Sequence, residues 1–165
     1  MLNKSKIKTA VIDDDLQMTE MLKDFIGQKY PDAEISIYTS GEDALDKIFE
    51  VQDLIILDYH LDSKNTEAMN GVQVLKKLKD RYPDVPIVFV SGQEKAEIAA
   101  NTMKYGAYDY IVKNENAFNR LEIVVKNILG NAELKKSAGT QKFFNYLLAA
   151  LIAALIIGIA VMKMG

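Results

Sequence analysis

The chain has 165 residues, a net charge of −3, a pI near 5.2 and no cysteine. This length suits one domain of ordinary size with an appendage, since domains commonly run to about 100 to 150 residues. The acidic balance argues against a nucleic-acid partner, which usually needs a basic patch. The absence of cysteine excludes disulfides, thiolate metal sites and a thiol nucleophile. The N-terminus reaches acidic residues before any apolar run of signal-peptide length, so we expect no secretion by that route.

Short apolar segments alternate with helical patterns along residues 6–130. Five segments predict strands: 8–13, 34–38, 53–58, 86–91 and 108–113. A helical pattern follows each of them, and in the first and the fifth an apolar stripe at helical spacing is clear. These stripes are Met18, Met21, Leu22, Phe25 and Ile26, and Leu121, Val124, Val125, Ile128 and Leu129. The alternation predicts an α/β fold of five βα units, (βα)5, on a parallel sheet.

Three predicted helices carry recognisable start signals. Ser40 with Asp43, and Asn70 with Gln73, resemble capping boxes, in which the first side chain accepts an otherwise unpaired backbone N–H. Asp15 stands where a carboxylate favours the positive end of the first helix. We therefore interpret Asp15 as a helix cap.

Polar side chains follow four of the predicted strands. Asp13 and Asp14 follow the first, Asp58 the third, Ser91 the fourth and Lys113 the fifth. In an open parallel sheet, ligands bind outside the carboxyl ends of the strands, near the point where the strand order reverses. We expect these side chains to converge on one small site.

Clustered carboxylates repel one another and need a cation or a proton to share a site. A hard divalent ion with oxygen ligands fits best, and Mg²⁺ is commonly held by one or two carboxylates together with water and phosphate oxygens. An aspartate can also be a nucleophile toward a phosphoryl donor. Lys113 and Ser91 would then hold the added oxygens.

The ordered motifs of this segment resemble the receiver domain of two-component response regulators. They are VIDDD (11–15), LIILD (54–58), NG (70–71), PIVFVSG (86–92) and GAYDYIVK (106–113). The resemblance covers about residues 6–130. It implies a doubly wound, five-stranded parallel sheet of the flavodoxin-like receiver type.

The resemblance also implies a role for each matching position. Asp58 resembles the phosphoacceptor, Asp13 and Asp14 the acidic pair that holds Mg²⁺, and Lys113 the lysine of the family. The backbone carbonyl of His60 would complete the metal shell, and Ser91 and Tyr110 resemble the switch residues. Phosphate would come from a histidine kinase or a phosphotransfer protein, and an unknown downstream protein would recognise the phosphorylated surface. Such a domain is not an enzyme that turns over an external substrate, because it only transfers phosphate to itself and then slowly hydrolyses its own aspartyl phosphate.

The chain departs from the family pattern at three places. Leu61 is followed by Asp62 and Lys113 by Asn114, where family members usually have proline, and the loop 62–69 is enlarged. These departures favour an alternative, a pseudo-receiver that docks at the membrane independently of phosphorylation. A second alternative is a Mg²⁺-dependent phosphatase with an aspartyl nucleophile. Those enzymes usually carry an aspartate two residues after the nucleophile, where this chain has His60.

The composition changes near residue 142. Residues 143–162 contain no charge, and twenty helical residues span roughly 30 Å, the hydrocarbon thickness of a bilayer. We predict a transmembrane helix there, although burial in an oligomer is an alternative. Residues 131–142 are polar and suit a flexible linker. The chain thus divides into a receiver (1–130), a linker (131–142) and a membrane helix (143–162).

Charges around the predicted membrane helix indicate its orientation. Lys135, Lys136 and Lys142 precede it and Lys163 alone follows it, so the positive-inside bias places the receiver on the cytoplasmic side of the membrane. Within the helix, small residues at positions 150, 154 and 158 form a stripe that could pair two helices as a homodimer. The sequence predicts a membrane-anchored, single-domain response regulator.

Overall fold

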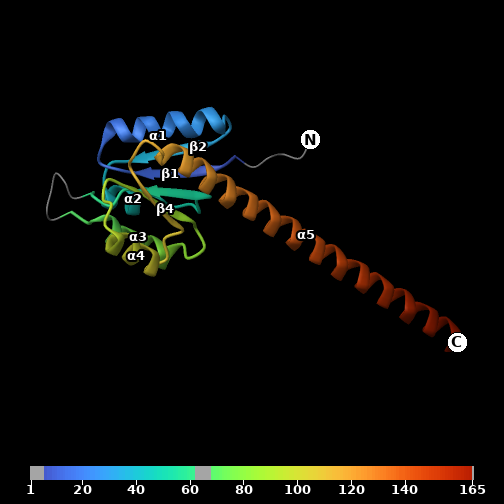
Figure 1. Ribbon diagram of the computed structural model, residues 1–165. Helices are drawn as coiled ribbons and strands as arrows, with labels where there is room; N and C mark the ends of the chain where they lie inside the picture. Colours follow the sequence, from blue (N-terminus) through green and yellow to red (C-terminus); the bar gives the residue numbers. More distant parts are fainter. Residues whose placement is uncertain (1–5, 62–67, 165) are drawn as a thin grey trace. The chain divides into compact units, whose positions relative to one another are not determined.

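The computed structural model describes residues 6–61 and 68–164, and describes only the backbone of residues 133, 135–139 and 152–164. Strands and helices alternate along the chain (Figure 1). The strands are β1 (Lys8–Ile12), β2 (Glu34–Tyr38), β3 (Leu54–Leu57), β4 (Ile87–Ser91) and β5 (Asp109–Val112). The helices are α1 (Leu16–Lys29), α2 (Gly41–Lys47), α3 (Gly71–Arg81), α4 (Ala96–Lys104) and α5 (Ala117–Met164). Each strand lies within one residue of its predicted bounds.

The five strands form one sheet in the order β2-β1-β3-β4-β5, with every neighbouring pair parallel. This confirms the predicted doubly wound, flavodoxin-like receiver fold. The order reverses between β1 and β3, so the carboxyl ends of these two strands flank the crevice where such folds place their ligands. Asp13 and Asp58 follow these two strands directly.

Helices cover both faces of the sheet, which explains why the central strands are apolar at nearly every position. Side chains of α2 and α3 pack with alternate residues of the strands in one buried cluster. On the other face, α1 pairs with the first turns of α5, where the rings of Phe25 and Phe118 lie 5.2 Å apart. The central strands β3 and β4 are buried along their whole length.

The predicted helix starts and stripes are mostly confirmed, with two exceptions. Asn70 and Gln73 form a complete capping box, whereas Ser40 makes only one half of its box by accepting the amide of Asp43. In α1, Met21 is 44% exposed, and Thr19 is buried instead. The free-energy cost of burying this threonine is small because its hydroxyl donates a hydrogen bond to the carbonyl of Leu16 at 2.8 Å.

The chain forms two compact units, residues 1–126 and 127–165, and α5 runs from the first into the second. Residues 131–142, where a flexible linker was expected, are helical throughout. The physical reason is composition. The segment has no proline and is rich in lysine, alanine and other good helix formers.

The predicted transmembrane helix at 143–162 is not supported by the structure. In the part of the chain that the structure describes, no helix is long and apolar enough to cross a membrane. Side chains are described only as far as residue 151, and a span needs about 20 apolar residues. The remainder of the predicted span lies outside the described side chains.

Candidate functional site

The backbone pairing of β1 and β3 brings the predicted aspartates together. The N–H of Asp58 donates to the carbonyl of Ile12 at 2.8 Å, which continues the β1–β3 pairing past the end of β3. Asp13, Asp14 and Asp58 each offer a carboxylate oxygen within 4.8 Å of the other two. Asp13 and Asp58 are buried, and Asp14 is 9% exposed. The predicted convergence of these three carboxylates is therefore present.

Lys113 reaches the same cluster from the end of β5. Its ammonium nitrogen lies 2.8 Å from Asp13 Oδ2 and 3.3 Å from Asp58 Oδ1. The backbone N–H of Lys113 donates to the carbonyl of Ser91 at 2.8 Å, so β4 and β5 fix where the lysine side chain starts. One ammonium group thus stands against two buried carboxylates.

Burial dominates the electrostatics of the cluster. It raises the pKa of the Asp13 and Asp58 carboxyl groups, against the opposing effect of Lys113. Burial by itself lowers the pKa of Lys113, but the hydrogen bond to Asp13 and the charges of Asp58 and Asp13 outweigh it, so the pKa is raised. When both carboxylates are ionised, the single ammonium group of Lys113 does not balance their negative charge. A bound cation would supply the missing positive charge.

The donors at this site fit a magnesium ion. Among the described residues, three carboxylates, those of Asp13, Asp14 and Asp58, each offer an oxygen atom that could ligate a metal ion here. Hard cations prefer such oxygen ligands, and Mg²⁺ in particular uses few protein ligands and retains water. Asp13, Asp14 and Asp58 are the residues that could hold it.

Backbone amides orient two of the carboxylates. The N–H of His60 donates to Asp58 Oδ2 at 3.1 Å, and the N–H of Asp15 donates to Asp13 Oδ1 at 3.0 Å. The side chain of Asp15 accepts the amides of Gln17 and Met18, which confirms its predicted role as the cap of α1. Asp15 therefore contributes its backbone to the site, and its carboxylate to the helix.

The connection from β3 to α3 is held by backbone amides after the enlarged loop. Residues 62–67, which make up most of that loop, lie outside the described residues. On their C-terminal side, the N–H of Met69 donates to the carboxylate of Glu42 at 2.7 Å. The N–H of Gly71 donates to the carbonyl of Tyr59 at 2.9 Å. The start of α3 is thereby attached directly to the residue that follows Asp58.

Ser91 and Tyr110 are linked through Gln93, which sequence reasoning missed. The N–H of Gln93 donates to the Ser91 hydroxyl at 3.3 Å, and the Tyr110 hydroxyl donates to the carbonyl of Gln93 at 2.8 Å. Tyr110 is buried, and its ring stacks on Phe89 at 6.1 Å. No sequence signal marks Gln93, because its backbone and not its side chain makes both contacts.

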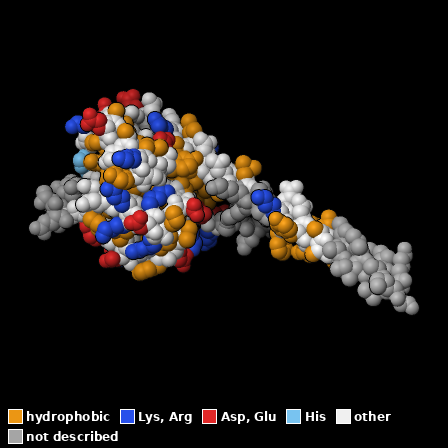
Figure 2. All heavy atoms as spheres, turned by 90° about the horizontal axis from the view of Figure 1, so that it is seen from below, with side chains coloured by type: hydrophobic (Ala, Val, Ile, Leu, Met, Phe, Trp, Pro, Cys, Tyr) orange, Lys and Arg blue, Asp and Glu red, His pale blue; other side chains and the backbone are white. Residues whose placement is uncertain are grey.

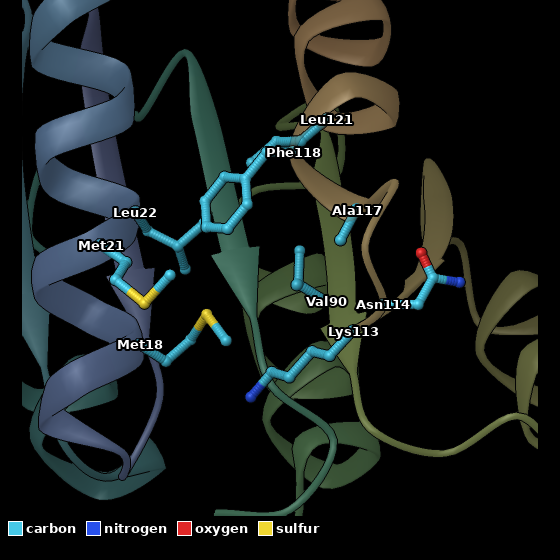
Figure 3. A pocket seen from close by; sticks show the side chains of 9 residues that line it. All are labelled: Met18, Met21, Leu22, Val90, Lys113, Asn114, Ala117, Phe118 and Leu121. Carbon is cyan, nitrogen blue, oxygen red and sulfur yellow. The ribbon is translucent and has the colours of Figure 1, made fainter.

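An apolar pocket of about 220 Å³ lies between α1 and the start of α5. Figure 3 shows Met18, Met21 and Leu22 of α1 facing Phe118 and Leu121 of α5, with Lys113 at the end nearest Met18. Because the same lysine contacts Asp13 and Asp58, the pocket adjoins the acidic cluster.

Charges of both signs share the surface of the first unit. On the face shown in Figure 2, Lys and Arg side chains are interspersed with Asp and Glu, and hydrophobic side chains lie between them. Several surface charges of the first unit are paired, among them Lys29 with Glu122 and Arg120 with Asp109, each at 3.0 Å.

The fold and the acidic site agree with a match to a known protein family. Residues 9–126 match the response regulator receiver domain. The chain belongs to this family, and it is a phosphoacceptor domain of two-component signalling. Receiver domains take phosphate from histidine kinases and use Mg²⁺ at an acidic pocket.

Relatives of known sequence share this part of the chain. The regulatory protein LuxO of Vibrio cholerae is 35% identical over 116 residues, which are 70% of this chain and 24% of that protein. The protein-glutamate methylesterase/protein-glutamine glutaminase of Pyrococcus horikoshii is 32% identical over 147 residues, or 84% of this chain and 37% of that enzyme. The chain thus matches between about a quarter and two fifths of the length of these relatives.

Solved structures share the fold. A two-component response regulator from Clostridium difficile is 29% identical with a TM-score of 0.66, covering 75% of this chain and 96% of that one. The receiver domain of NtrX from Brucella abortus is 26% identical with a TM-score of 0.65, covering 74% and 98%.

Proposed function

We propose that Asp58 is the phosphoacceptor of this receiver and that Asp13 and Asp14 share a magnesium ion with it. One observation carries the proposal. The buried Asp58 carboxylate lies 3.3 Å from the Lys113 ammonium group and within 4.8 Å of two further carboxylates. This arrangement supports the proposal because it would bring a nucleophilic oxygen, a bound cation and a phosphate-binding ammonium group together.

The proposed reaction is transfer of a phosphoryl group from a partner's phosphohistidine. A carboxylate oxygen of Asp58 attacks phosphorus, the P–N bond breaks, and the imidazole nitrogen keeps the electron pair and takes up a proton. Lys113 and Ser91 would hold the phosphoryl oxygens by charge and by hydrogen bonding. A bound Mg²⁺, with the carbonyl of His60 as a further ligand, would neutralise charge on the carboxylates and on the phosphoryl group. Water later hydrolyses the acyl phosphate, which returns Asp58 and releases phosphate.

The output is proposed to be a change in protein binding. Ser91 and Tyr110 both contact the backbone of Gln93, so a phosphoryl oxygen that recruits the Ser91 hydroxyl would alter the loop that leads into α4. The partners are a histidine kinase or phosphotransfer protein upstream and an unknown protein downstream. We propose no turnover of external substrates, and mixing the protein with small phosphate esters and Mg²⁺ tests this.

Membrane attachment through residues 143–162 is a separate proposal. It is supported by the charge-free composition of that segment and by the lysines that precede it, which favour a receiver on the cytoplasmic side. Fractionation of cells that express the full chain, followed by alkaline carbonate washing, tests it. Retention in the washed membrane is expected. Release into the supernatant would contradict a spanning helix, and would leave the site chemistry untouched.

The full chain, incubated with Mg²⁺ and acetyl phosphate, tests the proposed phosphoacceptor directly. Intact mass should show one added phosphate on the wild type and none on Asp58→Asn. Phosphate on both proteins would place the acceptor elsewhere. If the folded wild type takes up no phosphate from the small donor or from kinases, and binds no Mg²⁺, the pseudo-receiver alternative is correct.

A further inference from the structure

We propose that Gly71 is a positioning residue for the Asp58 carboxylate, and that it acts through the peptide group between Tyr59 and His60. The inference rests on the proposed role of Asp58 as phosphoacceptor and adds a residue that does not touch phosphate or metal. Three features carry it: a pair of hydrogen bonds, the fixed shape of a peptide group, and the space around Gly71.

Both ends of the Tyr59–His60 peptide group are hydrogen-bonded. Its carbonyl accepts the N–H of Gly71 at 2.9 Å, and its N–H donates to Asp58 Oδ2 at 3.1 Å. A peptide group is planar, and its C=O and N–H point in opposite directions. Gly71 therefore determines, through the carbonyl, the direction from which the N–H approaches the carboxylate.

The two oxygens of Asp58 consequently have different partners. The His60 amide holds Oδ2, and the Lys113 ammonium group lies 3.3 Å from Oδ1. Rotation of the carboxylate about its own axis would disturb both contacts. Since small errors in the direction of attack are costly in a positioned reaction, this restraint favours a fast transfer.

Only glycine allows α3 to begin so close to β3. A Cβ atom on residue 71 would lie 2.2 Å from the backbone oxygen of Asp58 and 2.9 Å from the Cα atom of Tyr59. Both are backbone atoms that cannot turn away as a side chain can. Alanine at this position must therefore move the start of α3 or the Asp58–Tyr59 segment, and the hydrogen bond between them changes with it.

Gly41 provides a matched control. It is the first residue of α2, as Gly71 is of α3, and a Cβ there would also meet an atom at 2.2 Å. That atom is a side-chain methyl group of Val74, on the core side of α3. Gly41→Ala should therefore disturb packing without touching the backbone around Asp58.

The test compares the full-length wild type, Gly71→Ala and Gly41→Ala. Thermal unfolding defines a temperature at which all three are folded, and the rate of phosphorylation by acetyl phosphate is measured there at saturating Mg²⁺. We expect Gly71→Ala to be slower than Gly41→Ala by about tenfold or more, as for a displaced catalytic group. Rates within about threefold of each other would overturn the proposal. If the wild type takes up no phosphate, the proposed function fails instead. The effect of Gly71 on the Asp58 carboxylate is then tested by the backbone amide signals described next.

Backbone amide signals give a second readout that needs no phosphorylation. In ¹⁵N-labelled wild type, the His60 amide proton should resonate downfield because it donates to a carboxylate, and Asp58→Asn should move it upfield. Gly71→Ala should move it in the same direction, and Gly41→Ala should leave it in place. If Gly71→Ala does not fold, hydrogen exchange on the wild type decides. Exchange of the Gly71 amide at the rate of a solvent-exposed amide would overturn the proposal, whereas strong protection would support it.

Discussion

The ammonium nitrogen of Lys113 lies 2.8 Å from a carboxylate oxygen of Asp13, one hundred residues earlier in the chain. This contact joins the last strand of the sheet to the first across the acidic cluster. Because Lys113 is the cation that opposes both Asp13 and Asp58, it combines a structural role with its proposed role in binding phosphate.

Removal of this cation should affect the reaction more than the fold. We expect Lys113→Ala to lower the phosphorylation rate by about 10²-fold, in the range found when one donor to a developing negative charge is lost. The rate is measured by intact mass with acetyl phosphate and saturating Mg²⁺. Lys126→Ala, which removes an exposed pairing with Glu122, serves as the control and should leave the rate unchanged. An unchanged rate in Lys113→Ala would show that the ammonium group does not assist transfer.

The raised pKa of Asp58 predicts that this aspartate destabilises the metal-free protein at neutral pH. A carboxyl group with a higher pKa in the folded state binds protons more readily when folded. The free energy of unfolding therefore falls as pH rises from 3.8, the ordinary pKa of an aspartate, through the raised pKa of Asp58 in the folded protein. Above that pKa it stays low. Asp58→Asn should raise the free energy of unfolding by about 1 kcal/mol, within the range of stabilising substitutions.

Denaturant titration in a chelating buffer at neutral pH measures this gain. Asp46→Asn, at an exposed position of α2, is the matched control and should change little. A variant at position 58 that is less stable than the wild type would mean that its contacts with Lys113 and the His60 amide outweigh its burial.

Binding of Mg²⁺ should release protons. The pKa values of Asp13 and Asp58 are raised by burial, and a metal ion binds only the ionised carboxylates. Affinity should therefore decrease as pH is lowered toward and through the raised pKa values of the two carboxyl groups. Calorimetric titrations in two buffers of different ionisation enthalpy measure the number of protons released. Asp58→Asn should release fewer, and an affinity of the wild type that does not fall with falling pH would contradict the raised pKa values.

Loss of the Tyr110 hydroxyl should make the loop after β4 more mobile without creating a cavity in the core. Tyr110→Phe keeps the ring on Phe89 but removes the hydrogen bond to the carbonyl of Gln93. The expected cost is about 1 kcal/mol of stability, typical of one hydrogen bond. Hydrogen exchange should become faster at Gln93 and its neighbours, while amides of α1 keep their protection. Equal exchange at Gln93 in both proteins would show that the hydroxyl does not restrain the loop.

The sheet and the acidic site could be predicted because both follow from local patterns. A buried parallel strand is apolar at successive positions, and the polar residue that ends it lies at the carboxyl edge whatever the loop beyond it does. Asp13, Asp58 and Lys113 were predicted to converge for this reason alone.

Other parts of the site could not be predicted, since they depend on backbone groups. The Gln93 bridge between Ser91 and Tyr110 uses only main-chain atoms of Gln93, which any residue supplies. The contact of Gly71 with Asp58 depends on how closely α3 approaches β3, which spacing along the chain does not reveal. The helical course of residues 131–142 was missed because glycine, serine and threonine outweighed the helix formers in the interpretation.

Asp15 connects the acidic site to the apolar pocket, so a signal from a residue of the pocket can report on the site. The N–H of Asp15 donates to Asp13 Oδ1, and the carboxylate of Asp15 accepts the N–H of Met18. The side chain of Met18 lines the pocket. A change of charge at Asp13 therefore reaches the first turn of α1 through a single residue. The methyl signal of Met18, labelled with ¹³C, becomes a reporter of metal and phosphate that leaves every residue of the site unmodified.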